Sequence, residues 1–137
     1  AVQAVADFDT CLLGSLVNRQ SISRAISASN IDRWSIVCAG TDGQVAGEDL
    51  LAAGAILDSL TKLTQVDIAG DSAMIALSLW QACQPSADSG LASQLEKFSG
   101  GFNLVQAGYR ADIQFAAKLD ALDVVPCRFG ESFKAAS

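Results

Sequence analysis

The stretch IVCAGTDGQVAGEDLLAAGA, residues 36–55, joins an apolar run to a glycine-rich turn and then to a second apolar run. Residues 34–39 (WSIVCA) have the continuous apolar character of a buried strand. Residues 46–64 carry leucine and isoleucine at helical spacing, and Glu48 and Asp49 stand where acids favour the start of a helix. The order of strand, turn and helix is typical of an α/β domain.

Helical and strand-like segments alternate along the rest of the chain. The pattern predicts strands over 10–16 and 123–128, and it predicts helices over 1–8, 18–27, 71–83, 86–98 and 111–119, with a further short helix before a break at Gly108. This alternation favours an α/β fold in three layers (α/β/α), with helices on both faces of a partly parallel, mixed sheet. Because only about three strands are clear, we expect the sheet to be incomplete in this chain alone.

Composition indicates a globular protein. The chain has 137 residues, of which 50% are hydrophobic and 18% are charged, which suits a single folded domain and excludes disorder. No apolar run approaches the roughly 18 residues of a membrane span, and no targeting signal stands out, so we expect a cytoplasmic protein with no membrane partner. The net charge of -6 argues against nucleic acid as a partner. A small anionic substrate stays compatible, because arginines and a bound cation can invert the local potential.

The absence of histidine limits the possible chemistry. Nucleophile systems that use an imidazole base cannot be built from this chain alone. The four cysteines, Cys11, Cys38, Cys83 and Cys127, are scattered and form no CxxC pair. We therefore interpret them as buried and reduced rather than as zinc ligands.

The turn CAGTDG, residues 38–43, has the properties of an anion site. Gly40 and Gly43 allow backbone N–H groups to turn toward an anion, and the following helix directs its positive end to the same place. The turn matches no P-loop or dinucleotide fingerprint. It also lacks the arginine of a cysteine phosphatase, because Gln44 stands at that position, so Cys38 is expected to be a strand residue and not a nucleophile.

Two interpretations fit the acidic pair Glu48 and Asp49. As neighbours on a helix they diverge by about 100° and do not both face one point. They could simply stabilise the start of the helix. Alternatively, one of them could hold Mg²⁺, which prefers oxygen ligands and retains several waters.

Several segments stand together in an order that characterises one family of enzymes. They are GSLVN (14–18), CAGTDG (38–43), EDLLAAGAI (48–56) and GYRADIQFAAKLDALDVVP (108–126). Over residues 14–126 the chain therefore resembles the 2-phosphosulfolactate phosphatase family. The resemblance implies an Mg²⁺-dependent acid phosphatase with an α/β/α fold, which hydrolyses 2-phosphosulfolactate to sulfolactate and phosphate in a route to coenzyme M.

The resemblance also implies a set of site residues. Those expected to bind the substrate or its phosphate are Asn18, Arg19, Gly40, Thr41 and Gly43. Glu48 and Asp49 are expected to be catalytic and to hold the metal. The substrate would be a small phosphorylated anion.

The sequence departs from the family pattern in two ways. Family members are considerably longer, so residues 1–137 are expected to form one domain that is the carboxyl-terminal portion of a phosphatase, with a missing amino-terminal segment as its partner. Where relatives often carry Ser-x-His-Gly, this chain has FSGGF at residues 98–102. A non-catalytic or divergent anion-binding relative with the same fold is therefore the alternative, and a homo-oligomer is compatible with either.

Overall fold

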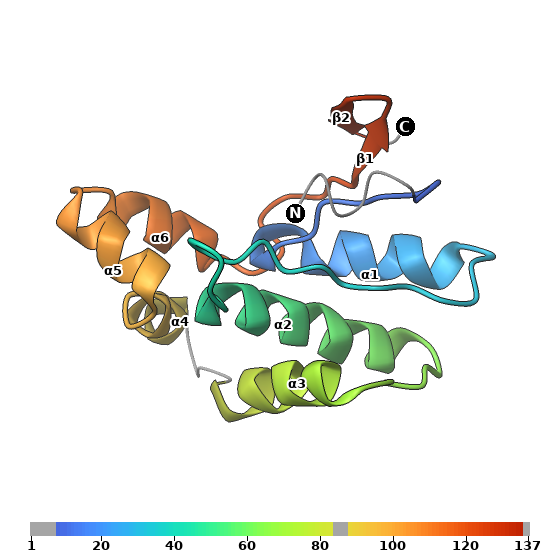
Figure 1. The fold of residues 1–137 in the computed structure, drawn as a ribbon, viewed down its shortest axis with the longest axis horizontal. Coiled ribbons are helices and arrows are strands. Elements are labelled where there is room, and N and C mark those ends of the chain that lie inside the picture. The colour runs from blue at the N-terminus through green and yellow to red at the C-terminus, as the bar shows by residue number, and fades with distance from the viewer. Residues whose placement is uncertain (1–7, 84–87, 136–137) are drawn as a thin grey trace.

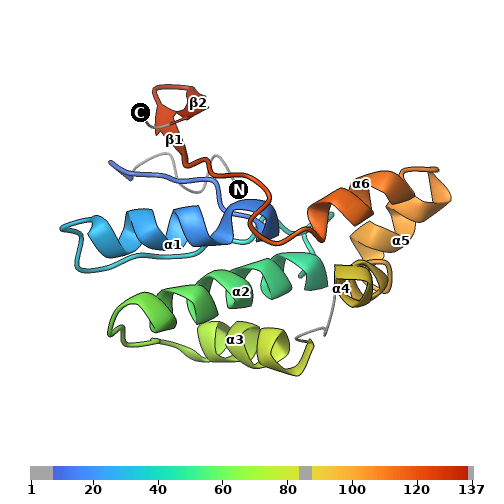
Figure 2. The same cartoon turned by 180° about the vertical axis from the view of Figure 1, so that it is seen from behind.

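The computed structural model describes residues 8–83 and 88–135, and helices dominate it (Figure 1). The elements in chain order are a 3-10 turn η2 (Leu16–Asn18), α1 (Arg19–Ala28), α2 (Gly47–Leu63), α3 (Asp71–Cys83), α4 (Asp88–Leu95), α5 (Ser99–Gln106), α6 (Arg110–Ala116), β1 (Pro126–Phe129) and β2 (Ser132–Ala135). Helix α2 lies between α1 and α3, as the views from front and back agree (Figures 1 and 2). Helices α4, α5 and α6 gather at the amino-terminal end of α2.

The central position of α2 follows from its sequence. Apolar residues surround much of the helix rather than forming one stripe, so it needs partners on more than one side. Leu51 and Ala55 are fully buried. Gly54 brings α3 close, because a Cβ atom built on it would overlap the carbonyl oxygen of Ala76 and lie 2.8 Å from Cβ of Trp80.

The core joins the α1–α3 layer to the α4–α6 group. Its buried members are Leu16, Leu51, Ala55, Trp80, Leu91, Leu95, Ile113 and Ala117. Because η2 supplies Leu16 and packs on both α2 and α6, it links the two parts. The start of α1 is thereby fixed against the rest of the molecule.

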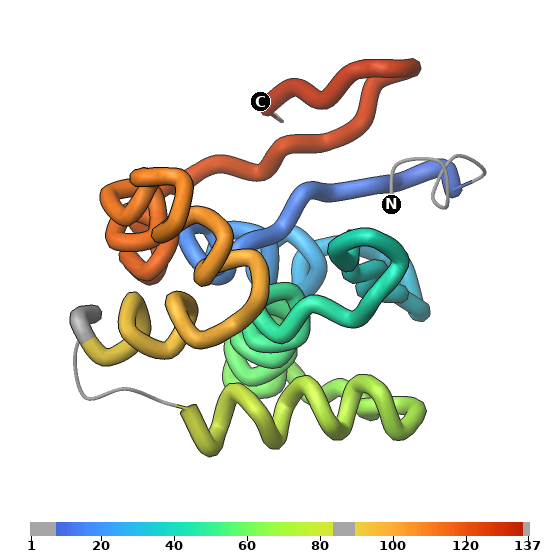
Figure 3. The backbone as a smooth tube through the Cα atoms, turned by 60° about the vertical axis from the view of Figure 1, so that its left-hand side comes forward, coloured from blue at the N-terminus to red at the C-terminus, as the bar shows by residue number. Residues whose placement is uncertain are grey.

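The two ends of the described chain run side by side. In Figure 3 the segment before η2 and the segment that leads into β1 follow each other closely. The N–H of Leu13 donates to the carbonyl of Pro126 over 2.9 Å, and the N–H of Arg128 donates to the carbonyl of Cys11 over 2.9 Å. Strand β1 then pairs with β2 in an antiparallel hairpin. Pro126 opens β1, a position where a proline removes little from a ladder.

The structure confirms most of the predicted helices. The expected helices over 18–27, 46–64 and 71–83 correspond to α1, α2 and α3, and the break at Gly108 separates α5 from α6. The helix expected over 1–8 falls almost entirely outside the described residues. Part of the helix expected over 86–98 does so as well, and the described part contains α4.

The strand predictions need correction. Of the strand expected over 10–16, only an isolated bridge at Leu12 is present, and Leu16 already begins η2. The hairpin partner β2 was not predicted. Residues 34–39 form no strand and run back beside α1 (Figure 1). A strand requires a hydrogen-bonded neighbour, and no described segment supplies one here, so Ile36 and Val37 stay 43% and 44% exposed.

The fold class predicted from the sequence, an α/β/α fold with a mixed sheet, agrees with the structure only in part. Helices together with a small sheet agree with an α/β class in its broad sense. The sheet of the described residues has two antiparallel strands, so these residues do not confirm a three-layer arrangement around a partly parallel sheet. Across residues 8–83 and 88–135, none of the helices combines the length and the apolar character that crossing a membrane requires.

Candidate functional site

A tight turn precedes α2 at residues 40–44. The N–H of Thr41 donates to the carbonyl of Gln44 over 3.1 Å, and the N–H of Gln44 donates back over 2.9 Å. Asp42 and Gly43, between them, both have positive φ, 52° and 75°, as a type I′ turn requires. Gly40 also has a positive φ of 70°, and a Cβ atom there would lie 2.6 Å from the carbonyl oxygen of Gln44. The glycines therefore set the shape of the loop predicted to bind phosphate.

Asp49 holds this turn against α2. Its Oδ2 accepts a hydrogen bond of 2.7 Å from the N–H of Gly40. The carboxylate thus occupies one of the backbone donors that the sequence assigned to phosphate, and Gln44 occupies the donor of Thr41. Within the described chain, the N–H groups of Asp42 and Gly43 make no backbone hydrogen bond outside regular elements and remain available to an anion.

Glu48 takes a different direction from Asp49, as neighbours on a helix should. Its carboxylate lies against the start of α5, where a Cβ atom on Gly100 would overlap Oε1 of Glu48. Its Oε2 is buried and has no hydrogen-bond partner among the described residues. Next to it, a Cβ atom on Gly47 would overlap the ring of Phe98. We call this contact between the start of α2 and residues 98–100 the Glu48–Gly100 junction.

The Glu48–Gly100 junction contains one carboxylate oxygen, Oε2 of Glu48, that a metal ion could bind. A buried carboxylate oxygen without a partner is costly unless a cation or a proton satisfies it. Among the described residues, no group of three metal-ligating side chains comes together. Mg²⁺ is commonly held by one or two carboxylates together with water and phosphate oxygens. The expectation that Glu48 and Asp49 hold this ion stays a prediction.

Asn18 ends the 3-10 turn η2, and both polar atoms of its side chain make hydrogen bonds. It is buried, and its Oδ1 accepts hydrogen bonds from the N–H and the hydroxyl of Ser15, over 2.8 and 3.1 Å. Its Nδ2 donates to the carbonyls of Leu13 and Val124, both over 3.1 Å. In this arrangement the amide of Asn18 ties together three segments of chain. Its predicted role as a substrate ligand stays a prediction.

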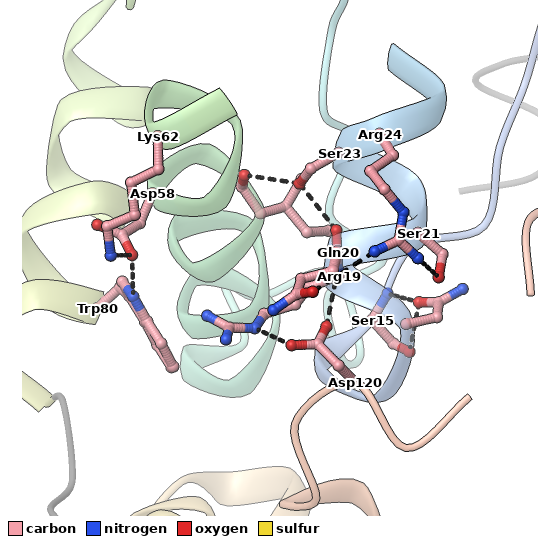
Figure 4. A network of polar contacts seen from close by, with 12 residues as sticks. Ser15, Arg19, Gln20, Ser21, Ser23, Arg24, Asp58, Lys62, Trp80 and Asp120 are labelled. Carbon is pink, nitrogen blue, oxygen red and sulfur yellow. Dashed lines mark hydrogen bonds and ion pairs between the residues drawn. The ribbon is translucent and has the colours of Figure 1, made fainter. Parts of the chain in front are cut away.

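Arg19 is held by the carboxyl-terminal part of the chain. Its Nε donates to Oδ2 of Asp120 over 2.9 Å, and its guanidinium carbon lies 5.6 Å from the ring centroid of Trp80 (Figure 4). The other carboxylate oxygen of Asp120 accepts the backbone N–H of Gln20 over 2.8 Å. Among the described residues, no hydrogen bond or ion pair joins Arg19 to the turn at 40–44. Asn18 and Arg19 thus bond to the carboxyl-terminal part of the chain, through Val124 and Asp120, and make no hydrogen bond or ion pair with the turn or the acidic pair among the described residues.

The pKa of the Cys38 thiol depends in part on the charge of Asp49. All four cysteines are free, as expected, but Cys38 is exposed and the other three are half-buried, so the prediction of buried cysteines is wrong for Cys38. The reason is the missing strand around it. Partial loss of water contact raises the pKa of the Cys38 thiol, and the negative charge of Asp49 raises that pKa further.

Alkylation of Cys38 should therefore respond to Asp49. A raised pKa lowers the thiolate fraction at a given pH, and the thiolate is the reactive form. We expect Asp49→Asn to lower the pKa of Cys38 and to speed its reaction with iodoacetamide by about two- to fivefold near pH 8. Mass spectrometry of the Cys38 peptide against pH measures this, with the exposed Asp67→Asn as the control. Equal rates in the two variants would contradict the contact.

Comparison with known proteins assigns the chain. A family model described as 2-phosphosulpholactate phosphatase matches residues 1–129. The chain belongs to the 2-phosphosulfolactate phosphatase family. This confirms the resemblance that the sequence motifs indicated.

Relatives within this family are similar along most of the chain. The probable 2-phosphosulfolactate phosphatase of Caldanaerobacter subterraneus subsp. tengcongensis is 33% identical over 129 residues, which are 92% of this chain and 50% of that protein. The probable 2-phosphosulfolactate phosphatase of Deinococcus radiodurans is 34% identical over 115 residues, which are 84% of this chain and 45% of that protein. The chain thus spans about half the length of the curated relatives it matches.

The Glu48–Gly100 junction joins two segments that the sequence singled out separately. Sequence reasoning singled out the acidic pair and, separately, the FSGGF segment that differs from the pattern of 2-phosphosulfolactate phosphatases. The structure places these two segments in contact, through Glu48 and Gly100. Sequence reasoning missed Gly100 itself, although two adjacent glycines at the start of a helix are an unusual choice and signal a close approach.

Proposed function

We propose that this chain is part of an Mg²⁺-dependent phosphatase that hydrolyses 2-phosphosulfolactate or a related small phosphorylated acid. Membership of the family and the names of its relatives support the reaction class. The observation that carries the proposal is the buried, unpartnered Oε2 of Glu48, next in sequence to the carboxylate that holds the glycine turn. Sulfolactate and phosphate would be the products, in a cytoplasmic route to coenzyme M.

In this proposal the two acids have separate tasks. Glu48 is the metal ligand, because its Oε2 is buried and has no hydrogen-bond partner among the described residues. Asp49 keeps the turn at 40–44 in place. It would also contribute negative charge close to the metal, either as a direct ligand or through a bound water. Mg²⁺, when bound, would neutralise charge that develops on the phosphoryl oxygens.

The glycine turn would position the phosphate. The N–H groups of Asp42 and Gly43 are the donors left free by the internal hydrogen bonds of the turn. Donors that are fixed in place before the reaction stabilise developing negative charge without reorganisation. Gly40 and Thr41 then act by shaping the turn, and Thr41 also offers its hydroxyl. Asn18 and Arg19 are kept as candidate substrate ligands, with the extra task of fixing the start of α1.

We also infer that further chain completes the fold. Residues 34–39 expose an apolar strand-like sequence beside α1, and the relatives have about twice the length of the matched region. Pairing with strands outside residues 1–137, from an amino-terminal segment or a second copy, would convert this run into part of a mixed sheet. The three-layer fold would then exist in the whole protein.

The activity of the full-length protein tests the proposal. Phosphate release from 2-phosphosulfolactate and from a generic phosphomonoester is measured with Mg²⁺ and with EDTA. We expect activity that requires Mg²⁺, and we expect Glu48→Gln to lose about tenfold or more of kcat/KM and to need more Mg²⁺ for half its activity. The exposed Glu131→Gln is the matched control. Activity that persists in EDTA, or an unaffected Glu48→Gln, would contradict the role of Glu48.

A second candidate is a non-catalytic relative that binds the same anion. The observation in its favour is the absence of histidine from the chain, including the FSGGF segment against which Glu48 lies. This candidate predicts saturable binding of 2-phosphosulfolactate with Mg²⁺ and no phosphate release from it. The assay above separates the two functions, because only the phosphatase releases phosphate.

A further inference from the structure

Gly100 is the second residue of α5, and its open side faces the carboxylate of Glu48 at the Glu48–Gly100 junction. A Cβ atom built on Gly100 would overlap Oε1 of Glu48 and would lie 2.9 Å from Cδ and 3.6 Å from Oε2. Apart from the adjacent residues and the backbone of α5, the three atoms nearest to this position all belong to Glu48. Glycine at position 100 therefore leaves room for one particular group, a carboxylate that comes from another helix.

Packing, and not hydrogen bonding, fixes the place of this carboxylate. Among the described residues, no hydrogen bond or ion pair holds the side chain of Glu48, and its Oε2 is buried. Helix α2 contacts α5, which lies at the amino-terminal end of α2 (Figures 1 and 2). Beside Glu48, the ring of Phe98 lies so close to Gly47 that a Cβ atom on this glycine would overlap it. The shape of the junction therefore decides where Oε2 lies.

The next glycine, Gly101, lies against a different kind of atom. A Cβ atom on Gly101 would overlap the carbonyl oxygen of Leu95 and would lie 2.7 Å from the carbonyl carbon, at the end of α4. Backbone atoms move aside only when a whole element shifts, whereas the end of a glutamate side chain can rotate to another rotamer. A methyl group at position 101 is therefore expected to strain the fold, and one at position 100 is expected to displace Glu48.

From this arrangement we infer that Gly100 is a positioning residue of the proposed metal site, because its lack of a side chain sets the place of the Glu48 carboxylate. The inference rests on the proposed function, since it takes Glu48 as the ligand of the metal. Groups that orient a metal ligand without touching the ion typically change metal affinity by about 10- to 100-fold. At Gly100 this orientation comes from the space that the glycine leaves, and not from a hydrogen bond.

Binding of Mn²⁺ in the absence of substrate tests this role on the full-length protein. Mn²⁺ accepts the same oxygen ligands as Mg²⁺, and its electron paramagnetic resonance signal measures the free ion. We expect Gly100→Ala to bind Mn²⁺ about tenfold more weakly than the parent, with a urea midpoint close to that of the parent. Gly101→Ala is the matched control in the same helical turn. It should lower the urea midpoint and yet bind Mn²⁺ more tightly than Gly100→Ala does.

Shortening the acid gives a readout that a purely structural role of Gly100 would not change. Glu48→Asp shortens the side chain by one methylene, about 1.5 Å, so its carboxylate no longer reaches a Cβ atom at position 100. Glu48→Asp should weaken Mn²⁺ binding by itself, and adding Gly100→Ala should then cost less than about twofold. In the phosphatase assay, Gly100→Ala should raise the Mg²⁺ concentration that gives half of the activity, while kcat at saturating Mg²⁺ stays close to that of the parent.

The possible results separate this inference from the proposed function. Parental Mn²⁺ affinity in a folded Gly100→Ala protein would overturn the inference, as would an equal loss of affinity in Gly101→Ala or in the Glu48→Asp background. If Gly100→Ala does not fold, Glu48→Asp should restore folding, and a failure to do so would also overturn the inference. The metal role of Glu48 survives these results when Glu48→Gln binds Mn²⁺ more weakly than the parent. A parent that binds no Mn²⁺, or a Glu48→Gln protein with parental affinity, would instead contradict the proposed function, and the inference with it.

Discussion

Replacing Asn18 with alanine is expected to lower the free energy of unfolding by about 4 kcal/mol, because each buried partner left unsatisfied costs about 1–3 kcal/mol. The amide makes four hydrogen bonds, to the N–H and hydroxyl of Ser15 and to the carbonyls of Leu13 and Val124. Alanine removes all of them and leaves four partly buried groups without their protein partner. Urea unfolding, followed by tryptophan fluorescence and far-UV circular dichroism, measures the loss.

Two variants separate this role from substrate binding. Asn30→Ala removes an exposed asparagine and should leave stability unchanged within about 0.5 kcal/mol. Asn18→Asp keeps an acceptor for Ser15 but turns a carboxylate oxygen toward the carbonyls of Leu13 and Val124, so it should lower stability as well. An Asn18→Ala protein with parental stability would show that the amide does not hold the fold together, and would return Asn18 to the role of a substrate ligand.

The helices could be predicted because the signal for them is local. In α2, apolar residues recur every three to four positions, and acids precede a basic last turn. In α3, Asp71 opens the helix, and both of its predicted bounds agree with the structure. These features depend on residues a few positions apart, which one sequence contains in full.

The strands could be predicted only in part because pairing is a property of distant residues. Residues 34–39 have the composition of a buried strand, but composition does not say whether a neighbour is present. Leu12 and Cys127 form a bridge across most of the chain, and no local pattern specifies that contact. The hairpin partner β2 lacks a continuous apolar run, which explains why it was missed.

In the candidate site, too, contacts between residues close in sequence could be predicted and contacts between distant residues could not. The glycine turn and the acids at the start of α2 are close in sequence, so their positions in one loop could be predicted from residues 40–49. Neither the contact of Glu48 with Gly100 nor the four hydrogen bonds of Asn18 could be predicted this way. For Asn18 the residue type was informative, since a buried asparagine is satisfied either by a ligand or by the chain itself. Sequence alone does not decide between these.

The close packing of α2 on α3 leads to the other large effect, at Gly54. In an exposed helix, replacing glycine with alanine typically stabilises by about 1 kcal/mol. Here the new Cβ atom would overlap the carbonyl oxygen of Ala76, a backbone atom that cannot rotate away, and would crowd Trp80. We expect Gly54→Ala to lower the free energy of unfolding by about 3 kcal/mol, because added volume in a packed core forces backbone shifts.

The spectrum of Trp80 distinguishes this steric cause from a general loss of stability. Its indole is 2% exposed and donates to Asp58, so separating α2 from α3 would admit water and shift its emission to the red, even without denaturant. Gly54→Leu should enlarge the shift and abolish a cooperative transition. The exposed Gly90→Ala in α4 is the matched control and should leave both the emission and the urea midpoint close to those of the parent chain. A stabilised Gly54→Ala with unshifted emission would mean that α2 and α3 do not touch at this residue.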